Sequence, residues 1–364
     1  MIPWLWRAAW LLLPAAWLVH RFAHDDTLTF FISCLSLIPL AKAMGDATED
    51  LSERLGAATG SLLNATFGNA AELILGITAL RQGHVALVKG SLTGSILGNL
   101  LLVAGASIVT GGVRFSRLKF NRLAASSSVS TLFLAVVAMV VPTLLAASSG
   151  PRYNASLLSE EISAVLIAMY ALSLLFGLRT HKGQLAQALP GDTLTGHGRA
   201  NAVTGQGVPG PSGSPWPQIG LLLLAAAATA VASELLVDSL GGTLARLKLP
   251  ETFVGVIIVA IVGNAAEHST ALIFARRGDM DVALGIAWES SKQIALLVAP
   301  VLVFVGILLG APMDLAFTRF EVIALGLAVI ALSLIVLDGE THWLEGAFLL
   351  AVYAVLGLGF FFIG

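Results

Sequence analysis

The 364-residue sequence has little charge, because Asp, Glu, Lys and Arg make up only 12% of it and the net charge is −2. Soluble domains carry roughly 25% charged residues, so this composition excludes an ordinary soluble protein. A weakly negative balance also gives no basis for nucleic-acid binding. Cys34 is the single cysteine, which excludes an internal disulfide and a cysteine-based metal cluster.

Long apolar runs are abundant instead. Hydrophobic residues form 57% of the chain and aromatic residues only 7%. Apolar runs without strand-like alternation predict an all-α integral membrane protein in contact with lipid, rather than a β-barrel. At about 20 apolar residues per span, we expect eleven transmembrane helices, at 3–22, 27–45, 57–80, 86–111, 123–147, 157–178, 218–240, 252–275, 282–308, 319–337 and 343–363.

Two segments need separate interpretation. Arg7 followed by an apolar run also fits a signal peptide, but no small-x-small cleavage site precedes His20, so we expect an N-terminal transmembrane helix. A Gly/Pro-rich segment without an apolar run predicts a flexible cytoplasmic linker. The expected units are therefore the helix 1–22, a first five-helix repeat 27–178, the linker 179–217 and a second five-helix repeat 218–364.

Lys and Arg predict the orientation. With a cytoplasmic N-terminus, most of them fall at cytoplasmic helix ends, including Arg114, Arg117, Lys119 and Arg122. The linker is then cytoplasmic and the C-terminus lies outside. The lack of targeting extensions favours a bacterial inner (plasma) membrane over an organelle. The sequence does not define the oligomeric state.

The motif Gly-Asn-Ala-Ala-Glu occurs twice, at residues 68–72 and 263–267, each time inside an apolar stretch. A carboxylate at such a position costs about 2.5–3.5 kcal/mol and therefore usually has a function. Two copies predict an internal repeat. Because five helices per repeat is an odd number, the copies have opposite orientations, which places a shared site near the bilayer midplane.

Each copy offers oxygen ligands. Asn69 and Glu72, like Asn264 and Glu267, are three residues apart and so project from one helical face. The preceding glycine permits an unwound turn with free carbonyls. Such ligands suit Ca²⁺ rather than zinc or copper, and we expect no cofactor. Without the metal, burial and mutual repulsion favour protonated carboxyls, so Ca²⁺ and H⁺ compete for the same two groups.

A polar island follows each motif in the next expected helix. Its side chains either complete the coordination shell or hydrogen-bond the preceding turn and pack helices. The amides require partners in any case. The first island contains Ser95 and Asn99, and the second contains Ser290, Ser291 and Gln293.

These motifs resemble the calcium/proton exchangers (the CAX family) of the calcium/cation antiporter superfamily. The resemblance extends from about residue 27 to the C-terminus and rests on residues 45–49, 64–74, 262–268, 293–296 and 298–300. It implies that Glu72 and Glu267 bind Ca²⁺ and exchange protons. It also implies eleven helices, with the first outside the repeats, and proton-driven removal of cytoplasmic Ca²⁺ by a transporter that is not an enzyme.

The chain departs from this family in its second island. The family usually has Gly-Ser-Ser-x-Gln, whereas this chain reads Glu-Ser-Ser-Lys-Gln. Glu289 and Lys292 are three residues apart, so we expect them to pair and to leave the charge of the site unchanged. Unpaired, a third carboxylate or a resident ammonium would alter ion choice or proton count.

Other polar residues admit two interpretations. His268 either shuttles protons or lines the pathway, but it points about 100° away from Glu267 around the helix. Acidic residues near the ends of two expected helices are either solvated or form a funnel that attracts cations. The possible funnel comprises Asp46, Glu49, Asp50, Glu234 and Asp238.

The favoured function is antiport of Ca²⁺ against H⁺ by alternating access. A sodium-driven or manganese-preferring exchanger of the same architecture is the main alternative, and a passive channel is another. Asp46-x-x-Glu49-Asp50 faintly resembles an acidic motif of membrane prenyltransferases. That enzyme interpretation leaves the repeated buried motif unexplained.

Overall fold

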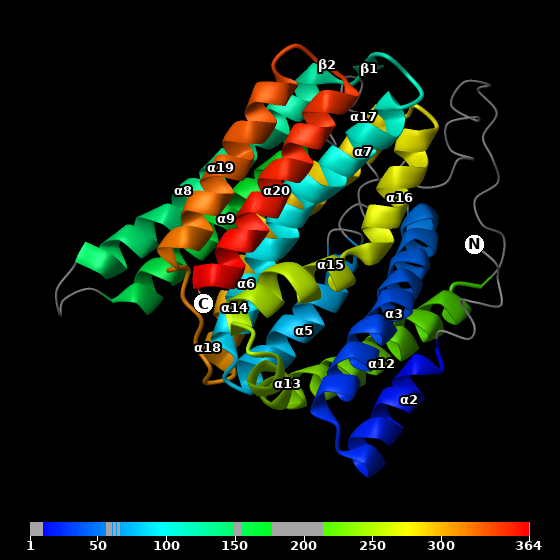
Figure 1. Cartoon of the computed structure of the whole chain (residues 1–364), viewed down its shortest axis with the longest axis vertical. Coiled ribbons are helices and arrows are strands. Elements are labelled where there is room, and N and C mark those ends of the chain that lie inside the picture. The colour runs from blue at the N-terminus through cyan, green and yellow to red at the C-terminus, as the bar shows by residue number, and fades with distance from the viewer. Residues whose placement is uncertain are drawn as a thin grey trace.

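A computed structural model of the chain describes residues 10–55, 60, 63, 66–148, 154–176 and 214–363, which are mainly helical (Figure 1). In this part of the chain, eight helices are long and apolar enough to cross a membrane. They are α3 (Asp26–Leu55), the continuous α6–η2–α7 (Val85–Gly112), α8 (Arg122–Ser148), α9 (Ala155–Leu175), α12 (Trp216–Asp238), the continuous α17–η6–α18 (Met280–Leu308), α19 (Arg319–Val336) and α20 (Trp343–Ile363), where η marks a π-helical segment.

The remaining elements are shorter. One series corresponds to the predicted span 252–275 and comprises α14 (Glu251–Phe253), η5 (Val254–Val259), α15 (Ala260–Gly263) and α16 (Ala265–Arg276). The others are α2 (Leu12–Leu18), η1 (Val19–Ala23), α5 (Ala70–Arg81), α13 (Leu240–Leu247), and the antiparallel pair β1 (Leu118–Lys119) and β2 (Glu340–Thr341).

The expected all-α membrane fold is confirmed in outline. The predicted span 252–275 is bent by 59°, at the break between α15 and α16. Counting that bent pair as one span gives up to nine candidates among the described residues, so the total of eleven stays a prediction. Residues 177–213, which include most of the predicted linker, lie outside the described residues.

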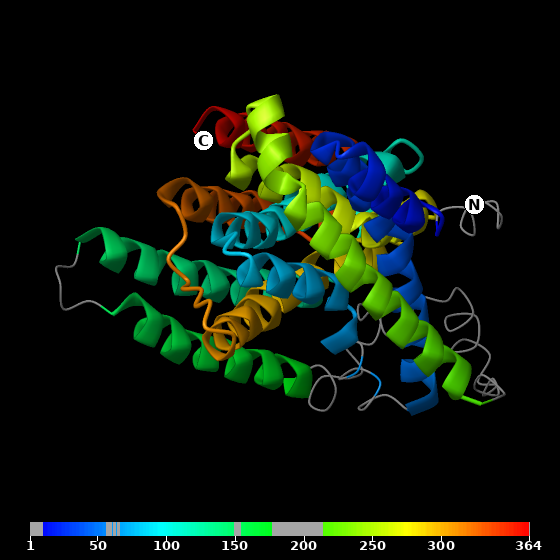
Figure 2. The ribbon, with the colours of Figure 1, turned by 90° about the horizontal axis from the view of Figure 1, so that it is seen from below.

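The segment α6–η2–α7 lies in the middle of the bundle in both views (Figures 1 and 2). In its most apolar window 83% of residues are buried, against 22% for α9 and for α20. The two peripheral helices therefore leave most of their apolar residues uncovered by the rest of the protein, whereas the central helix is enclosed by it. Its serine and asparagine side chains must find partners inside the bundle.

Glycine allows α6 to touch η5 backbone to backbone. A Cβ added at Gly94 would lie 2.1 Å from the carbonyl oxygen of Val256, and one at Gly255 would lie 2.8 Å from that of Leu87. Cβ atoms essentially never come within 3.0 Å of another atom. This contact joins the first polar island to the segment that leads into the second motif.

Helices α3 and α12 run side by side in opposite directions. At one end, Gln218 near the start of α12 donates to Asp50 near the end of α3, at 3.4 Å. At the other end, Arg246 in α13 pairs with Asp25, just before α3, at 3.2 Å. The helices that precede the two motifs are therefore antiparallel neighbours.

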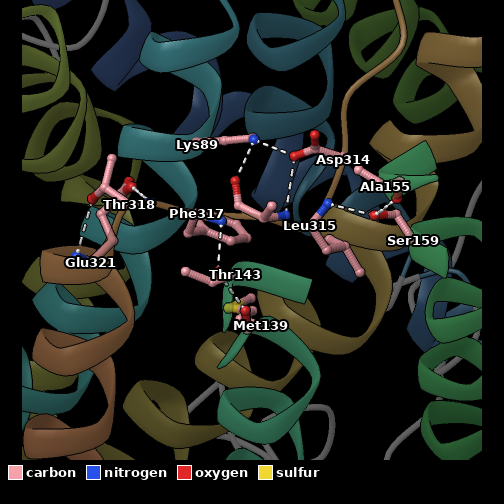
Figure 3. A network of polar contacts seen from close by, with 11 residues as sticks. Lys89, Met139, Thr143, Ala155, Ser159, Asp314, Leu315, Phe317, Thr318 and Glu321 are labelled. Carbon is pink, nitrogen blue, oxygen red and sulfur yellow. Dashed lines mark hydrogen bonds and ion pairs between the residues drawn. The ribbon is translucent and has the colours of Figure 1, made fainter. Parts of the chain in front are cut away.

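The loop 309–318 between α18 and α19 is fixed by side chains of three helices (Figure 3). Lys89 on α6 lies 2.5 Å from Asp314 Oδ1 and donates to the carbonyl oxygen of Ala316 at 2.7 Å. Backbone N–H groups of the loop donate to hydroxyls of α9 and α8, Leu315 to Ser159 and Phe317 to Thr143. Side chains thus replace the regular hydrogen bonding that this loop lacks.

Candidate functional site

Both motifs interrupt a helix at their asparagine. Asn69 precedes α5 with φ −104° and ψ 24°, and Asn264 separates α15 from α16 with φ −94° and ψ 7°. The side chain of Asn264 donates to the carbonyl oxygen of Ala260 at 3.0 Å, a local bond that competes with helix continuation. Each copy therefore has a short break in the helix at its asparagine. The backbone carbonyls of Asn69, Ala260 and Asn264 still accept hydrogen bonds, so the expected unwound turn with free carbonyls stays a prediction. Glu72 and Glu267 then lie in the first turn of the following helix.

Three buried asparagines are held through their amide nitrogens. Asn69, Asn99 and Asn264 are each at most 1% exposed. Every one of these nitrogens donates to a side chain from the other half of the chain. The bonds run from Asn69 to Gln293 Oε1, from Asn99 to Ser290 Oγ at 3.0 Å, and from Asn264 to Ser95 Oγ at 2.8 Å.

The side-chain amide oxygens (Oδ1) of the same asparagines have no hydrogen-bond partner among the described residues. Oε2 of Glu267 is buried and unpartnered in the same way. Leaving one buried acceptor unpaired costs about 1–3 kcal/mol, so a group of them requires a reason. Hydrogen bonds hold the amide groups in place while their oxygens stay available. Such oxygens are the ligands that a hard cation prefers.

The two motif carboxylates come near each other. A Cβ added at Gly263 would lie 3.7 Å from Glu72 Oε1, so the first carboxylate lies beside the second motif. Glu72 is also within electrostatic range of Glu267. Ser290, whose hydroxyl accepts from Asn99, also lies near the Glu267 carboxyl. Both glutamates are half-buried.

The other predicted residues of the second half are partly brought to the site. Ser291 is buried and donates to the carbonyl oxygen of Ala287 in its own helix, which fits the packing interpretation. His268 Nε2 is buried and has no partner among the described residues. Lys292 Nζ lies 2.5 Å from Glu289 Oε1, so the expected pairing is confirmed.

The acidic residues of the possible funnel lie on α3 and α12. Asp46 pairs with Lys42 at 2.8 Å and is exposed, as is Asp50, whereas Glu49 is half-buried. Glu234 and Asp238 lie on the exposed side of α12 near its other end, where Gln82 donates to Asp238 at 2.8 Å. The two groups thus lie at opposite ends of the α3–α12 pair, and their role as a funnel stays a prediction.

Glu321 is a buried carboxylate that the sequence analysis did not single out. It is 1% exposed, and its oxygens accept from the Thr93 hydroxyl at 3.2 Å and from the Thr318 N–H at 2.8 Å. Thr318 in turn accepts from the Glu321 N–H, which completes a capping box at the start of α19. The pattern Thr-x-x-Glu is the sequence signal of that motif. Its bonds account for Glu321 as a structural residue.

Comparisons with known proteins show which family the chain belongs to. The sequence profile of the family described as sodium/calcium exchanger protein matches residues 26–179 and 217–362. The chain is 40% identical to a Ca(2+)/H(+) antiporter of Aphanothece halophytica, over 97% of this chain and 95% of that protein. It is 42% identical to the Ca(2+)/H(+) antiporter ChaA of Bacillus subtilis (strain 168), over 91% of each.

A solved structure extends the similarity to the fold. The structure of native YfkE superimposes with a TM-score of 0.81 at 37% identity, and the match covers 98% of this chain and 99% of that one. The prenyltransferase interpretation is therefore wrong, because the relatives that match along the whole chain are transporters. With its membrane-spanning helices, this chain is an integral membrane transporter that belongs to the sodium/calcium exchanger protein family.

Proposed function

We propose that the protein exchanges cytoplasmic Ca²⁺ for H⁺, with Glu72 and Glu267 as shared binding groups. The observation that carries this proposal is the set of buried acceptor oxygens beside the two carboxylates. The side-chain amide nitrogens of Asn69, Asn99 and Asn264 donate hydrogen bonds to the other half of the chain, whereas their side-chain oxygens have no partner among the described residues. The printed names of the relatives, Ca(2+)/H(+) antiporters, support the same pair of ions.

The exchange chemistry follows from charge. Two ionised carboxylates neutralise one divalent cation, and amide oxygens complete a hard-ligand shell. When the cation leaves, two facing carboxylates in a low dielectric are unfavourable, so protons replace it. Because ligands must lose their protons to bind metal, each ion displaces the other. Unpaired His268 Nε2 is next to Glu267 in the chain, and we propose a place for it on the proton pathway.

An inverted repeat supports alternating access at this site. Adding 195 to positions 69, 72 and 95 gives 264, 267 and 290, so Asn, Glu and Ser recur in register. The same offset moves the π-helical segment 98–103 to 293–298, where η6 (Ile294–Val298) occurs. The antiparallel α3 and α12 also fit opposite orientations of the halves.

The finer architecture remains part of this proposal. It comprises eleven helices divided as 1–22, 27–178 and 218–364, a cytoplasmic linker 179–217, a cytoplasmic N-terminus and a C-terminus outside. The bacterial relatives support a plasma-membrane location.

Purified protein in liposomes tests the function. An imposed pH gradient, in sodium-free buffer, is expected to drive Ca²⁺ uptake that a protonophore collapses. Protein-free liposomes and liposomes without a pH gradient are the controls. Uptake that persists without any gradient, at a rate set by Ca²⁺ alone, would indicate a passive channel and contradict the proposal.

The family description gives a reason to test a second candidate, exchange driven by sodium. A sodium gradient at equal pH on both sides is expected to drive no uptake if protons are the counter-ion. Competition by Mn²⁺ in the same assay measures ion preference. Uptake that requires sodium would replace the proton proposal with the sodium alternative.

A further inference from the structure

Helix α17 presents two neighbouring polar faces to different parts of the bundle. Ser290 and Gln293 are three residues apart and contact the site, through Asn99 and Asn69 respectively. Glu289 directly precedes Ser290, and Lys292 directly precedes Gln293. These two residues form an ion pair, which therefore lies about 100° around the helix from the site contacts. Site contacts and ion pair are therefore rigidly coupled through one helical turn.

The ion pair lies within α17, and its carboxylate connects this helix to the helices behind it. Its side chains are only 20% and 11% exposed, for Glu289 and Lys292. Ser128 on α8 donates to Glu289 Oε1 at 3.3 Å, and Tyr170 on α9 is within electrostatic range of the same carboxylate. Charges at such depth require a partner, since an unpaired one is strongly unfavourable in a membrane.

The first half has no such pair at the equivalent place. Subtracting 195 from 289 and 292 gives 94 and 97, which are Gly94 and Leu97. Gly94 fixes α6 by touching the backbone at Val256, where even a Cβ would collide. At these equivalent positions, α6 therefore makes a close backbone contact, whereas α17 has an ion pair; the ion pair of α6, between Lys89 and Asp314, lies elsewhere on that helix.

We infer that Glu289 and Lys292 are positioning residues for Ca²⁺ binding: their pair sets the rotation of α17 and so keeps Ser290 on Asn99 and Gln293 on Asn69. Neither side chain touches the transported ion. The inference rests on the proposed function and adds two residues to it. Second-layer groups that orient metal ligands typically contribute roughly 10- to 100-fold to affinity.

Four variants test the pair in proteoliposomes at fixed pH: Glu289→Gln, Lys292→Met, the charge reversal Glu289→Lys with Lys292→Glu, and the control Lys119→Met. Lys119 on β1 is exposed and pairs with Glu340 on β2 at 3.3 Å. Each single change at the buried pair is expected to raise the Ca²⁺ concentration for half-maximal uptake roughly 10- to 100-fold. The charge reversal is expected to return it to within a few-fold of the parent, and Lys119→Met to leave it unchanged.

Ca²⁺-dependent protection against thermal unfolding, measured in detergent, gives a second readout of affinity. A loss of thermal stability with unchanged Ca²⁺ half-saturation in both assays overturns the inference, because the pair would then only hold the fold. A charge reversal no better than the single changes also overturns it, since one residue would then act alone. If a single variant does not fold, Glu289→Asp and Lys292→Arg carry the same comparison. Parent protein without proton-driven uptake contradicts the proposed function, whereas an active parent with unaffected single variants contradicts only this inference.

Discussion

The two halves of this chain share an Asn, a Glu and a Ser in register and differ in the contacts made at positions 94 and 289. Both halves have Asn and Glu around a broken helix, and both have a serine in the next span that bonds to the other half. Gly94 in the first half lies against a neighbouring backbone. At the equivalent position in the second half, Glu289 takes part in an ion pair.

This difference indicates which positions the chemistry restricts. A site for one divalent cation between two halves needs a carboxylate and an amide from each, so those positions recur in register. The means of holding a helix in place is less restricted, because close packing and a satisfied ion pair can both do it. Substitutions at the shared positions can therefore be compared with substitutions at positions that belong to one half.

The largest effect is expected at the shared carboxylates. Glu72→Gln and Glu267→Gln each remove half of the negative charge that balances Ca²⁺. Each is expected to reduce proton-driven uptake by more than the roughly 100-fold typical of outer-layer changes. Initial uptake rates at equal amounts of folded protein measure this. Substantial uptake activity in one variant and none in the other would contradict equivalent roles for the two carboxylates.

The amide oxygens are expected to come next. Asn69→Ala and Asn264→Ala remove equivalent free oxygens and should raise the Ca²⁺ half-saturation about 10- to 100-fold, by similar factors. Asn154→Ala is a matched control, because Asn154 caps α9 by accepting from the Leu157 N–H at 3.1 Å. It is expected to cost about 1 kcal/mol of stability and to leave Ca²⁺ affinity unchanged. Equal affinity losses in all three variants would show that helix stability, not ligation, is being measured.

A smaller effect, on thermal stability, is expected at the close backbone contact of Gly94 in the first half. Gly94→Ala forces a Cβ to within 2.1 Å of the Val256 oxygen, and overpacking of this kind costs about 1–3 kcal/mol. Gly220→Ala is the control, since nothing lies within 4 Å of its Cβ position on the exposed side of α12. It should be neutral or stabilise slightly. The thermal unfolding midpoints of the two variants measure this difference. An unchanged midpoint for Gly94→Ala would contradict the close contact between Gly94 and the Val256 backbone.

The smallest effect is expected at an exposed ion pair, which contrasts with the buried one on α17. The Leu28 N–H, with Arg246, holds the pKa of Asp25 below its ordinary value of 3.8. A lowered pKa in the folded protein stabilises it at neutral pH, and this contribution disappears only as the pH falls through that low value. Asp25→Asn should therefore lower the unfolding midpoint less than Gly94→Ala does, and not at all in strong acid. A loss as large as that of Gly94→Ala at neutral pH would contradict this ranking.

The sequence predicts the parts of this molecule that repeat. Duplicated motifs and apolar runs indicate the membrane fold and the candidate ligands, and the spacing of Glu289 and Lys292 indicates their pairing. The sequence could not reveal which amide bonds which serine or glutamine, because those bonds join residues more than 150 positions apart. The glycine indicates a break near Asn264, but the bend of 59° could not be predicted, since hydropathy reports the length of an apolar stretch and not its direction.

One measurement tests the central claim most directly: the protons released when Ca²⁺ is added to detergent-solubilised protein in weakly buffered solution, with Ca²⁺ binding followed calorimetrically in the same sample. If Glu72 and Glu267 hold either the cation or protons, the parent releases protons as Ca²⁺ binds, and release is lost in the Glu72→Gln, Glu267→Gln double variant. Saturable Ca²⁺ binding by the parent without proton release, across the pH range of transport, would contradict the account.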